Sequence, residues 1–331
     1  MNKIKYLRLA SAFTLALPAI TLAQPATRDA AQAYPSRPIR IIAQFTPGTS
    51  TDVMARVVAL KLAAAFNQQV IVDNRPGAGA ILGTEIAAKA SPDGHTLVAA
   101  VSSAFGINPT LYAKLPYDAI KDFDPIINLA LTAQALVASP AAPFKSLKEF
   151  VAIAREKPGA FNYASLGAGS TSHLTTEMFR SAAGLKINHI PFKGSGEAHT
   201  QLMGGQIPVM SDTIPATLQH IKSGRLRGLG IATLKRSPLL PDLPTIAEAG
   251  YAGFEAVGWI GLAAPAGTPT AVLDKLNAEI NKTLNEADFK ERLNTLAFTP
   301  VGGTRKEFAD FIKAEIAKWG KAVKESGARV D

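Results

Sequence analysis

The stretch "IINLALTAQALVA", residues 126–138, is unusually long and apolar for a strand of this chain, and residues 254–264 form a second such run. A chain of 331 residues is long enough for two domains with separate cores, but no segment has the composition of a flexible linker. We therefore expect both runs to cross between the domains as ordered strands. Domain I is then built from residues 34–127 and 260–331 and domain II from residues 128–259, with a hinge and a cleft between two lobes.

Shorter β-branched runs alternate with helical patterns along the rest of the chain, which is typical of an α/β architecture with largely parallel sheets. The predicted strands cover residues 39–43, 70–72, 97–101, 161–164, 187–191, 207–211 and 228–232. Helix starts are expected at two capping boxes and one capped proline: Ser146–Glu149, Thr304–Glu307 and Thr268–Pro269. The apolar faces of these helices are interpreted as core.

The first residues have the pattern of a cleavable signal peptide. Three basic residues precede an apolar run over residues 9–22, and small residues lead up to Ala23, so we expect residues 1–23 to be removed. The run is too short for a confident membrane span, and no comparable run follows. The chain contains no cysteine, so no disulfide or lipidated cysteine is expected. We expect an exported, soluble protein in the periplasm of a Gram-negative host.

The charge balance says little about a partner. The formal net charge is +9, and three of the basic residues lie in the signal peptide, which leaves 9 − 3 = +6. That excess favours anionic partners only weakly. No Lys/Arg block carries interleaved aromatic residues, so with export the sequence excludes a nucleic-acid partner.

Two loops follow the same plan of strand, glycine turn, hydroxyl cluster and helix: "TPGTSTD" (46–52) and "YASLGAGSTSHL" (163–174). The first N–H groups of a helix lack acceptors within it and carry partial positive charge, so they bind anions without lysine or arginine. Neither loop contains a basic residue, which favours a carboxylate ligand. A hydrogen bond to a charged group contributes about 1.5–3 kcal/mol and micromolar affinity needs about 8 kcal/mol, so one loop alone would bind weakly, whereas two loops that close on one ligand from opposite lobes can reach that affinity.

The same loops allow other interpretations. Hydroxyl residues are preferred N-caps and can serve the two helices alone. Ser170 and His173 can also suggest a secreted serine-type hydrolase, although no Gly-x-Ser-x-Gly elbow occurs and both residues would occupy one helical turn. We expect His173 to bond locally within the cap and the protein not to be an enzyme. Phosphate is the second candidate anion, but the P-loop signature is absent.

Three further features of the sequence are candidate sites. Residues 77–83 loosely resemble a dinucleotide fingerprint, but the third glycine is one residue late and no acidic residue lies at the expected distance. We expect a tight turn with close helix packing there, and a surface role for Arg75. The five histidines have no paired ligand spacing, so neither a metal nor a cofactor is expected. Ser102 and Asp212 end predicted strands, where they can line the cleft; Asp212 can equally cap the following turn.

Eight segments, in order over nearly the whole chain after residue 72, carry a family resemblance: "DNRPGAGAILGTEIAAKASPDGHTL" (73–97), "NPTLY" (108–112), "NYASLGAGSTSHL" (162–174), "PFKGSGEA" (191–198), "LMGGQIPVMSD" (202–212), "IKSGRLRGLGIAT" (221–233), "RSPLLPDLPTIAEAGY" (236–251) and "GLAAPAGTP" (261–269). Together they resemble the extracytoplasmic solute receptors of tripartite tricarboxylate transporters, often called Bug receptors. The resemblance implies a periplasmic-binding-protein type II fold, with two α/β lobes joined by crossing strands and closing on a ligand.

The resemblance also implies a small carboxylate ligand: an organic or aromatic acid, or an acidic amino acid. Backbone amides, hydroxyls and waters would hold it, and a large and a small membrane subunit would receive it from a monomeric receptor. Loops 45–52 and 164–173 match the two jaws of the family. With the strand ends they give these ligand-binding candidates: Phe45, Thr49, Ser50, Thr51, Asp52, Ser102, Ser165, Gly169, Ser170, Thr171, His173 and Asp212. A solute sensor that presents its closed form to a signalling protein is the alternative to transport.

The first loop departs from the family pattern. Members commonly have a glycine run after the first-loop proline, whereas residues 48–52 of this chain read Gly-Thr-Ser-Thr-Asp. Side chains therefore replace bare backbone, which narrows the pocket or adds hydroxyl contacts. The sequence does not name the ligand, because specificity depends on the pocket shape.

Overall fold

A computed structural model describes residues 34–330 of the chain. The predicted signal peptide, residues 1–23, lies outside the described residues. Within them, no helix combines the length and apolarity needed to cross a membrane.

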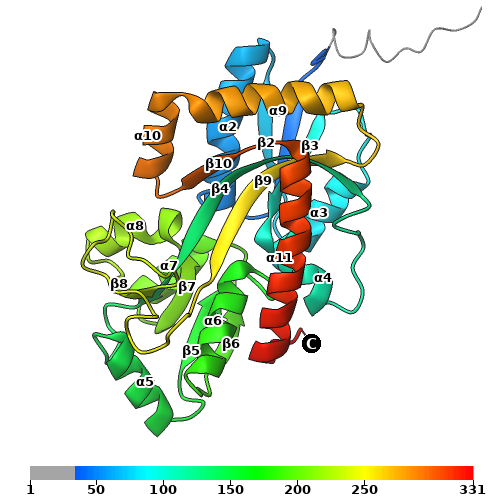
Figure 1. The fold of residues 1–331 in the computed structure, drawn as a ribbon. Helices are drawn as coiled ribbons and strands as arrows, with labels where there is room; N and C mark the ends of the chain where they lie inside the picture. Colours follow the sequence, from blue (N-terminus) through cyan, green and yellow to red (C-terminus); the bar gives the residue numbers. More distant parts are fainter. Residues whose placement is uncertain (1–33, 331) are drawn as a thin grey trace, which may run out of the picture.

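Strands and helices alternate along most of the chain (Figure 1). The strands are β1 (Ile39–Ala43), β2 (Val70–Asn74), β3 (Thr96–Val101), β4 (Phe123–Ala138), β5 (Asn162–Ser165), β6 (Asn188–Pro191), β7 (Val209–Thr213), β8 (Arg227–Ile231), β9 (Val257–Pro265) and β10 (Thr299–Gly302). The helices are α2 (Ser50–Phe66), η1 (Ala78–Ala80), α3 (Ile81–Ala88), η2 (Ser103–Ile107), α4 (Asn108–Leu111), α5 (Leu147–Glu156), α6 (Thr171–Ala182), α7 (Ser195–Met203), α8 (Ile214–Lys222), α9 (Thr270–Asn285), α10 (Ala287–Thr295) and α11 (Arg305–Ser326). Every predicted strand is present within three residues of its expected bounds.

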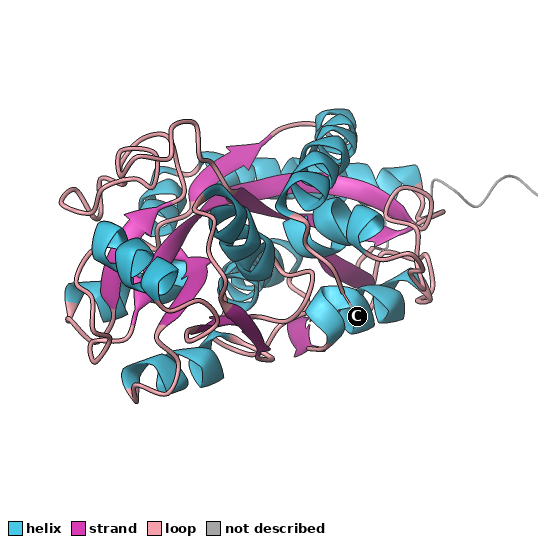
Figure 2. Cartoon of the chain, turned by 90° about the horizontal axis from the view of Figure 1, so that it is seen from below, coloured by secondary structure: helices cyan, strands magenta, loops and turns pink. Residues whose placement is uncertain are grey.

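The two halves of the sheet repeat one topology. In the first half the order is β2-β1-β3-β9-β4, with β1 parallel to both β2 and β3 and β9 antiparallel to β3. In the second half the order is β6-β5-β7-β4, with β5 parallel to both β6 and β7 and β4 antiparallel to β7. Helices lie on both sides of the strands (Figure 2). The order β2-β1-β3 thus corresponds to the order β6-β5-β7. The loops after β1 and β5 therefore occupy equivalent positions, and so do the loops after β3 and β7.

Strand β4 belongs to both halves. Up to Ala133 it pairs with β9, and from Gln134 to Ala138 it pairs with β7, while its last four residues also pair with β8. It begins three residues before the predicted run 126–138, and β9 begins three residues after the start of the predicted run 254–264. The division of the chain at residues 127/128 and 259/260 stays a prediction.

Helix α11 packs against both cores. Phe308 and Ile312 belong to the core of the first half, and Trp319 and Val323 belong to a core of the second half. In Figure 1 this helix runs from the upper half to the lower half of the molecule. The end of α11 thus packs against the second half, and the assignment of residues 260–331 to domain I stays a prediction.

The helix starts agree with the predicted caps at two of three positions. Ser146 caps α5 and Thr304 forms a capping box with Glu307. The expected Thr268 cap of α9 is wrong, because Pro269 is the N-cap and the Thr268 hydroxyl donates to the carbonyl of Pro265 at 2.7 Å. That nearby carbonyl competes with the helix for the short hydroxyl side chain.

A buried carboxylate ties α11 to β9. Glu315 Oε2 accepts hydrogen bonds from the indole N–H groups of Trp259 at 3.0 Å and Trp319 at 2.7 Å, and all three residues are buried. The ring of Trp259 also packs edge-on against Phe308. A buried donor that loses its partner costs about 1–3 kcal/mol, so this carboxylate matters for both tryptophans.

We expect Glu315→Ala to lower the free energy of unfolding by about 1–3 kcal/mol, because two buried indole N–H groups lose their acceptor. Urea titration followed by intrinsic fluorescence measures this directly, since the chain has only two tryptophans. Glu325→Ala, at an exposed position on the same helix, is the matched control. A loss no larger than that of the control contradicts the assignment.

Candidate functional site

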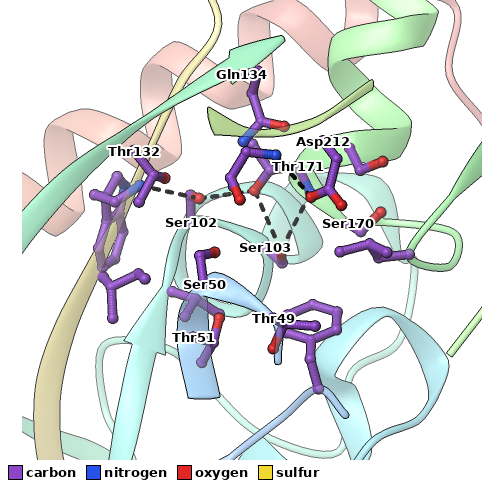
Figure 3. Close-up of a pocket in the computed structure, with 17 residues that line it drawn as sticks. Thr49, Ser50, Thr51, Ser102, Ser103, Thr132, Gln134, Ser170, Thr171 and Asp212 are labelled. Carbon is purple, nitrogen blue, oxygen red and sulfur yellow. Dashed lines mark hydrogen bonds between the residues drawn. The ribbon is translucent and has the colours of Figure 1, made fainter. Parts of the chain in front are cut away.

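A pocket lies where the carboxyl ends of β1, β3, β5 and β7 converge on the two long strands β4 and β9, and its cavity volume is about 30 Å³ (Figure 3). The first half contributes Phe45, Thr49, Ser50, Thr51, Val101, Ser102 and Ser103. The second half contributes Leu166, Ser170, Thr171, Ser172, Asp212 and Thr213, and β4 and β9 contribute Thr132, Gln134, Trp259 and Ile260. This is the edge at which open α/β sheets bind ligands.

Helix α2 begins at the pocket wall. Thr49 is its N-cap, with extended backbone dihedrals, and its side chain accepts from the backbone N–H of Asp52 at 3.5 Å. Ser50 and Thr51 are the first two helical residues and line the pocket. Their N–H groups lie in the first turn, where no acceptor exists within the helix.

Helix α6 begins at the same pocket from the other half. Ser170 is its N-cap and accepts from the backbone N–H of His173 at 3.1 Å. Gly167 and Gly169 precede it with φ of 101° and 81°, the left-handed region that favours glycine. The triple-hydroxyl clusters thus cap the helices and also line one cavity.

Hydroxyl groups bond across the pocket between the two halves. Ser102 and Thr171 lie 2.8 Å apart between their hydroxyl oxygens, and the Ser103 hydroxyl accepts from the backbone N–H of Thr171 at 3.3 Å. The backbone N–H of Trp259 donates to Ser102 at 3.4 Å (Figure 3). Gly258 of β9 leaves room for this network, because a Cβ there would lie 2.9 Å from the Thr132 hydroxyl and 3.1 Å from that of Ser102.

The pocket wall contains one ionisable side chain. Among the 17 residues that line it, none is lysine or arginine, and Asp212 is the single acid. Asp212 is buried; its Oδ2 lies 3.0 Å from Nε2 of the buried His199, and its Oδ1 accepts from the backbone N–H of Thr213 at 2.7 Å. It therefore fulfils both expectations: it lines the cavity and caps the turn that follows β7.

Eight of the twelve candidate residues line the pocket: Phe45, Thr49, Ser50, Thr51, Ser102, Ser170, Thr171 and Asp212. Asp52, Ser165, Gly169 and His173 lie outside its wall. Asp52 bonds instead to Arg56, to Asn74 at 2.9 Å and to the backbone N–H of Gly48 at 3.0 Å. Burial raises the pKa of the Asp52 carboxyl, but these hydrogen bonds outweigh it and hold the pKa below its usual range.

Ser165 and His173 belong to a neighbouring aromatic and polar cluster. The Ser165 hydroxyl lies 2.5 Å from Nε2 of His189, and the rings of His173 and His189 are 4.2 Å apart between centroids. Burial, and after it the neighbouring His173, lowers the pKa of His189 to about 4, so its imidazole is neutral at pH 7. Burial also lowers the pKa of His173.

The hydrolase interpretation finds no support in this geometry. Nδ1 of His173 accepts from the backbone N–H of Gly169 at 3.4 Å, and Ser170 accepts from the backbone N–H of His173 instead of bonding to its ring. A general base must reach the proton of its nucleophile. Among residues 34–330, no group of three or more His, Cys, Asp or Glu is placed to hold a metal ion.

Sequence reasoning missed the pocket residues on the crossing strands. Thr132 and Gln134 are polar positions two apart within the apolar run 126–138, so they share one face of β4. That spacing is a usable signal for a polar face on an otherwise buried strand. Trp259 and Ile260 carry no such signal, because apolar side chains on β9 read as core.

Glycines allow the two halves to approach each other beside the pocket. A Cβ on Gly79 would overlap the carbonyl of Ala168, and one on Gly194 would overlap the Thr46 side chain. Asn108 donates to the carbonyl of Gly79 at 3.0 Å, and Tyr112 donates to the carbonyl of Ala168 at 3.0 Å. The segment 77–83 is thus a tight turn that packs closely on the opposite loop.

The helix packing and surface role expected around residues 77–83 are also present. A Cβ on Gly83 would lie 2.9 Å from the carbonyl of Arg75 and 3.0 Å from the Gln44 side chain, so α3 packs closely there. The half-exposed Arg75 side chain pairs with Asp73 at 3.0 Å.

Comparison with known proteins agrees with this fold. Residues 54–328 match the model of the tripartite tricarboxylate transporter family receptor, TctC. The protein BugT of Bordetella pertussis is 39% identical over 310 residues, covering 93% of this chain and 94% of that one. An R. palustris protein, Rpa4515, solved with adipate, is 32% identical with a TM-score of 0.87, covering 90% of this chain and 100% of that one.

A second solved structure has a bound ligand of the same class. MatC from Rhodopseudomonas palustris, with bound malate, is 32% identical with a TM-score of 0.84, covering 88% of this chain and 100% of that one. The arrangement of two α/β halves around one pocket is the periplasmic-binding-protein fold. By sequence and structure alike, this chain belongs to the tripartite tricarboxylate transporter receptor family, whose members are periplasmic binding proteins and not enzymes.

Proposed function

We propose that this protein captures a small carboxylate in the pocket between its two halves and delivers it to a tripartite tricarboxylate-type membrane transporter. One observation carries the proposal: the N-termini of α2 and α6 meet the same cavity from opposite halves, and no basic side chain lines it. Unpaired N–H groups and the helix dipoles at two such termini favour an anion without a salt bridge.

The chemistry of the wall suits a carboxylate. Hydroxyl groups of Thr49, Ser50, Ser170 and Thr171 stand beside the first-turn N–H groups of the two helices. Adipate and malate in the solved relatives belong to the same ligand class. Each hydrogen bond to a charged group contributes about 1.5–3 kcal/mol, so one helix terminus falls short of the roughly 8 kcal/mol that micromolar binding requires.

Capture by closure follows from the contacts between the halves. Thr46 and Gly194 meet on one side of the cleft, and Gly79 and Ala168 meet near the same loops. These contacts exist only when the two jaws are together. Ligand binding and jaw closure are therefore one equilibrium in this proposal, and the closed form is what the membrane partner receives.

A screen of aliphatic and aromatic acids tests the proposal directly. The protein is unfolded and refolded to remove carried-over ligand, and thermal shift then selects acids for isothermal titration. We expect at least one small carboxylate to bind with a micromolar or lower Kd and to raise the melting temperature by mass action. The absence of any response across both classes of acid contradicts the proposal.

We expect the double variant Thr49→Ala, Ser170→Ala to weaken binding of the acid found in that screen at least tenfold, because one hydroxyl is lost from each jaw. Each change also removes an N-cap and costs about 1 kcal/mol of stability, which the melting temperature records separately. Ser146→Ala removes an N-cap from α5, away from the pocket, and is the matched control. Unchanged affinity in the double variant rules out the two-jaw site.

Closure itself is tested by Gly194→Ala. The φ of Gly194 is −176°, extended backbone that alanine also adopts, but the new methyl group would overlap Thr46 across the cleft. We expect affinity to fall about tenfold or more with little change in melting temperature. Gly196→Ala, where a Cβ meets open space, is the control, and Thr46→Gly should restore binding to the Gly194→Ala variant. Normal affinity in Gly194→Ala removes the Thr46–Gly194 contact from the closing mechanism.

A further inference from the structure

The walls of the pocket differ in hydrogen-bonding character. Thr49, Ser50 and Thr51 with the start of α2 lie on one side of the cavity, and Gln134 and Asp212 lie on the opposite side (Figure 3). The first side offers N–H and O–H donors to a carboxylate. The second side comes from adjacent strands, where Gln134 of β4 pairs with Thr213 of β7, and Ala135 pairs with Asp212.

Three buried polar atoms on the second side have no hydrogen-bond partner among the described residues. They are Oε1 of Gln134, Oγ1 of Thr213 and Oδ2 of Asp212, which has only the ion-pair contact with Nε2 of His199 at 3.0 Å. A buried polar atom without a partner is costly, and all three residues line the cavity. The Thr213 hydroxyl can donate or accept, whereas the oxygens of Gln134 and Asp212 are free to accept from a ligand group that donates.

Asp212 determines whether this side of the cavity accepts or donates hydrogen bonds. An amide such as Gln134 can turn either its oxygen or its NH₂ group to a ligand, whereas an ionised carboxylate only accepts. Asp212 is 1% exposed, and its partners are His199 and the N–H of Thr213, each of which leaves further lone pairs on the carboxylate oxygens. A second ligand carboxylate facing this acid would meet a like charge in a buried site, and no lysine or arginine in the wall offsets it.

We propose that the ligand is a carboxylate whose far end is a hydrogen-bond donor, a hydroxyl or an ammonium group, which Asp212 and Gln134 accept. This inference rests on the proposed carboxylate capture and narrows its ligand class. The carboxylate lies against the start of α2, and the donor lies against β4 and β7, beside the start of α6, whose Ser172 hydroxyl donates to the carbonyl of Ser211 in β7. Plain α,ω-dicarboxylates of matched length are discriminated against, since their second carboxylate would face Asp212.

A series of acids that differ only in the terminal group tests this. For chains of three to six carbons, the unsubstituted acid, the ω-hydroxy acid, the ω-amino acid and the α,ω-dicarboxylate are titrated calorimetrically into refolded protein. We expect an ω-hydroxy or ω-amino acid to bind at least tenfold more tightly than the dicarboxylate of the same length. Equal or tighter binding of the dicarboxylates overturns this inference and leaves carboxylate capture standing. If no acid binds, carboxylate capture itself fails.

Asp212→Asn distinguishes the two kinds of donor. If the ligand donor is an ammonium group, loss of the charge should weaken the ω-amino acid at least tenfold and spare the ω-hydroxy acid, because an amide oxygen still accepts from a hydroxyl. With either kind of donor, the affinity for the dicarboxylate should rise relative to the affinities for the ω-hydroxy acid and the ω-amino acid. Asp242→Asn, at an exposed position in the same half, is the matched control. If Asp212→Asn leaves the ranking of all four terminal groups unchanged while its far-ultraviolet circular dichroism matches the parent, Asp212 is not the selecting residue.

Discussion

The fold depends on strand β4 being shared between the two halves of the sheet. Its residues up to Ala133 complete the first half beside β9, and its residues from Gln134 complete the second half beside β7. The strand order β2-β1-β3 of the first half is repeated as β6-β5-β7 in the second half, each beside a long antiparallel strand. The carboxyl ends of β1, β3, β5 and β7 therefore all face the line where β4 changes partners. The pocket lies at that line, so its position is determined by strand pairing and does not depend on any individual side chain.

The sequence predicted the strands and both jaws well, because strand–turn–helix units are encoded locally. Thr49 and Ser170 occupy the N-cap positions that their residue type favours, and those positions border the pocket. What the sequence does not predict depends on tertiary contacts. Asp52 belongs to the polar cluster of the first loop, yet it bonds to Asn74, 22 residues further along the chain, and does not line the cavity. In the sequence Trp259 has the pattern of an ordinary buried strand residue, and only the folded structure shows that it lines the pocket.

One physical explanation accounts for both the absence of basic side chains from the pocket wall and the presence of Asp212 in it. An arginine would fix the ligand through its charge and would also neutralise Asp212, so the acid could no longer select. With recognition of the anion left to two helix termini, the opposite wall keeps its own polarity. In the binding mode that we propose, attraction of the anion and selection of the far end of the ligand are assigned to different walls of one cavity.

Helix α11 adds a mechanical consequence. Two strands that join two rigid bodies permit both bending and twisting between them. A third connection, whose Phe308 is anchored in one core and Trp319 in another, resists twisting because its two ends would have to rotate against each other. Glu315 lies between these anchor points and accepts from the indole N–H of Trp259 in β9, so the helix cannot slip along the strands without breaking that hydrogen bond. In the closing movement that we propose, α11 therefore favours bending between the two halves over twisting.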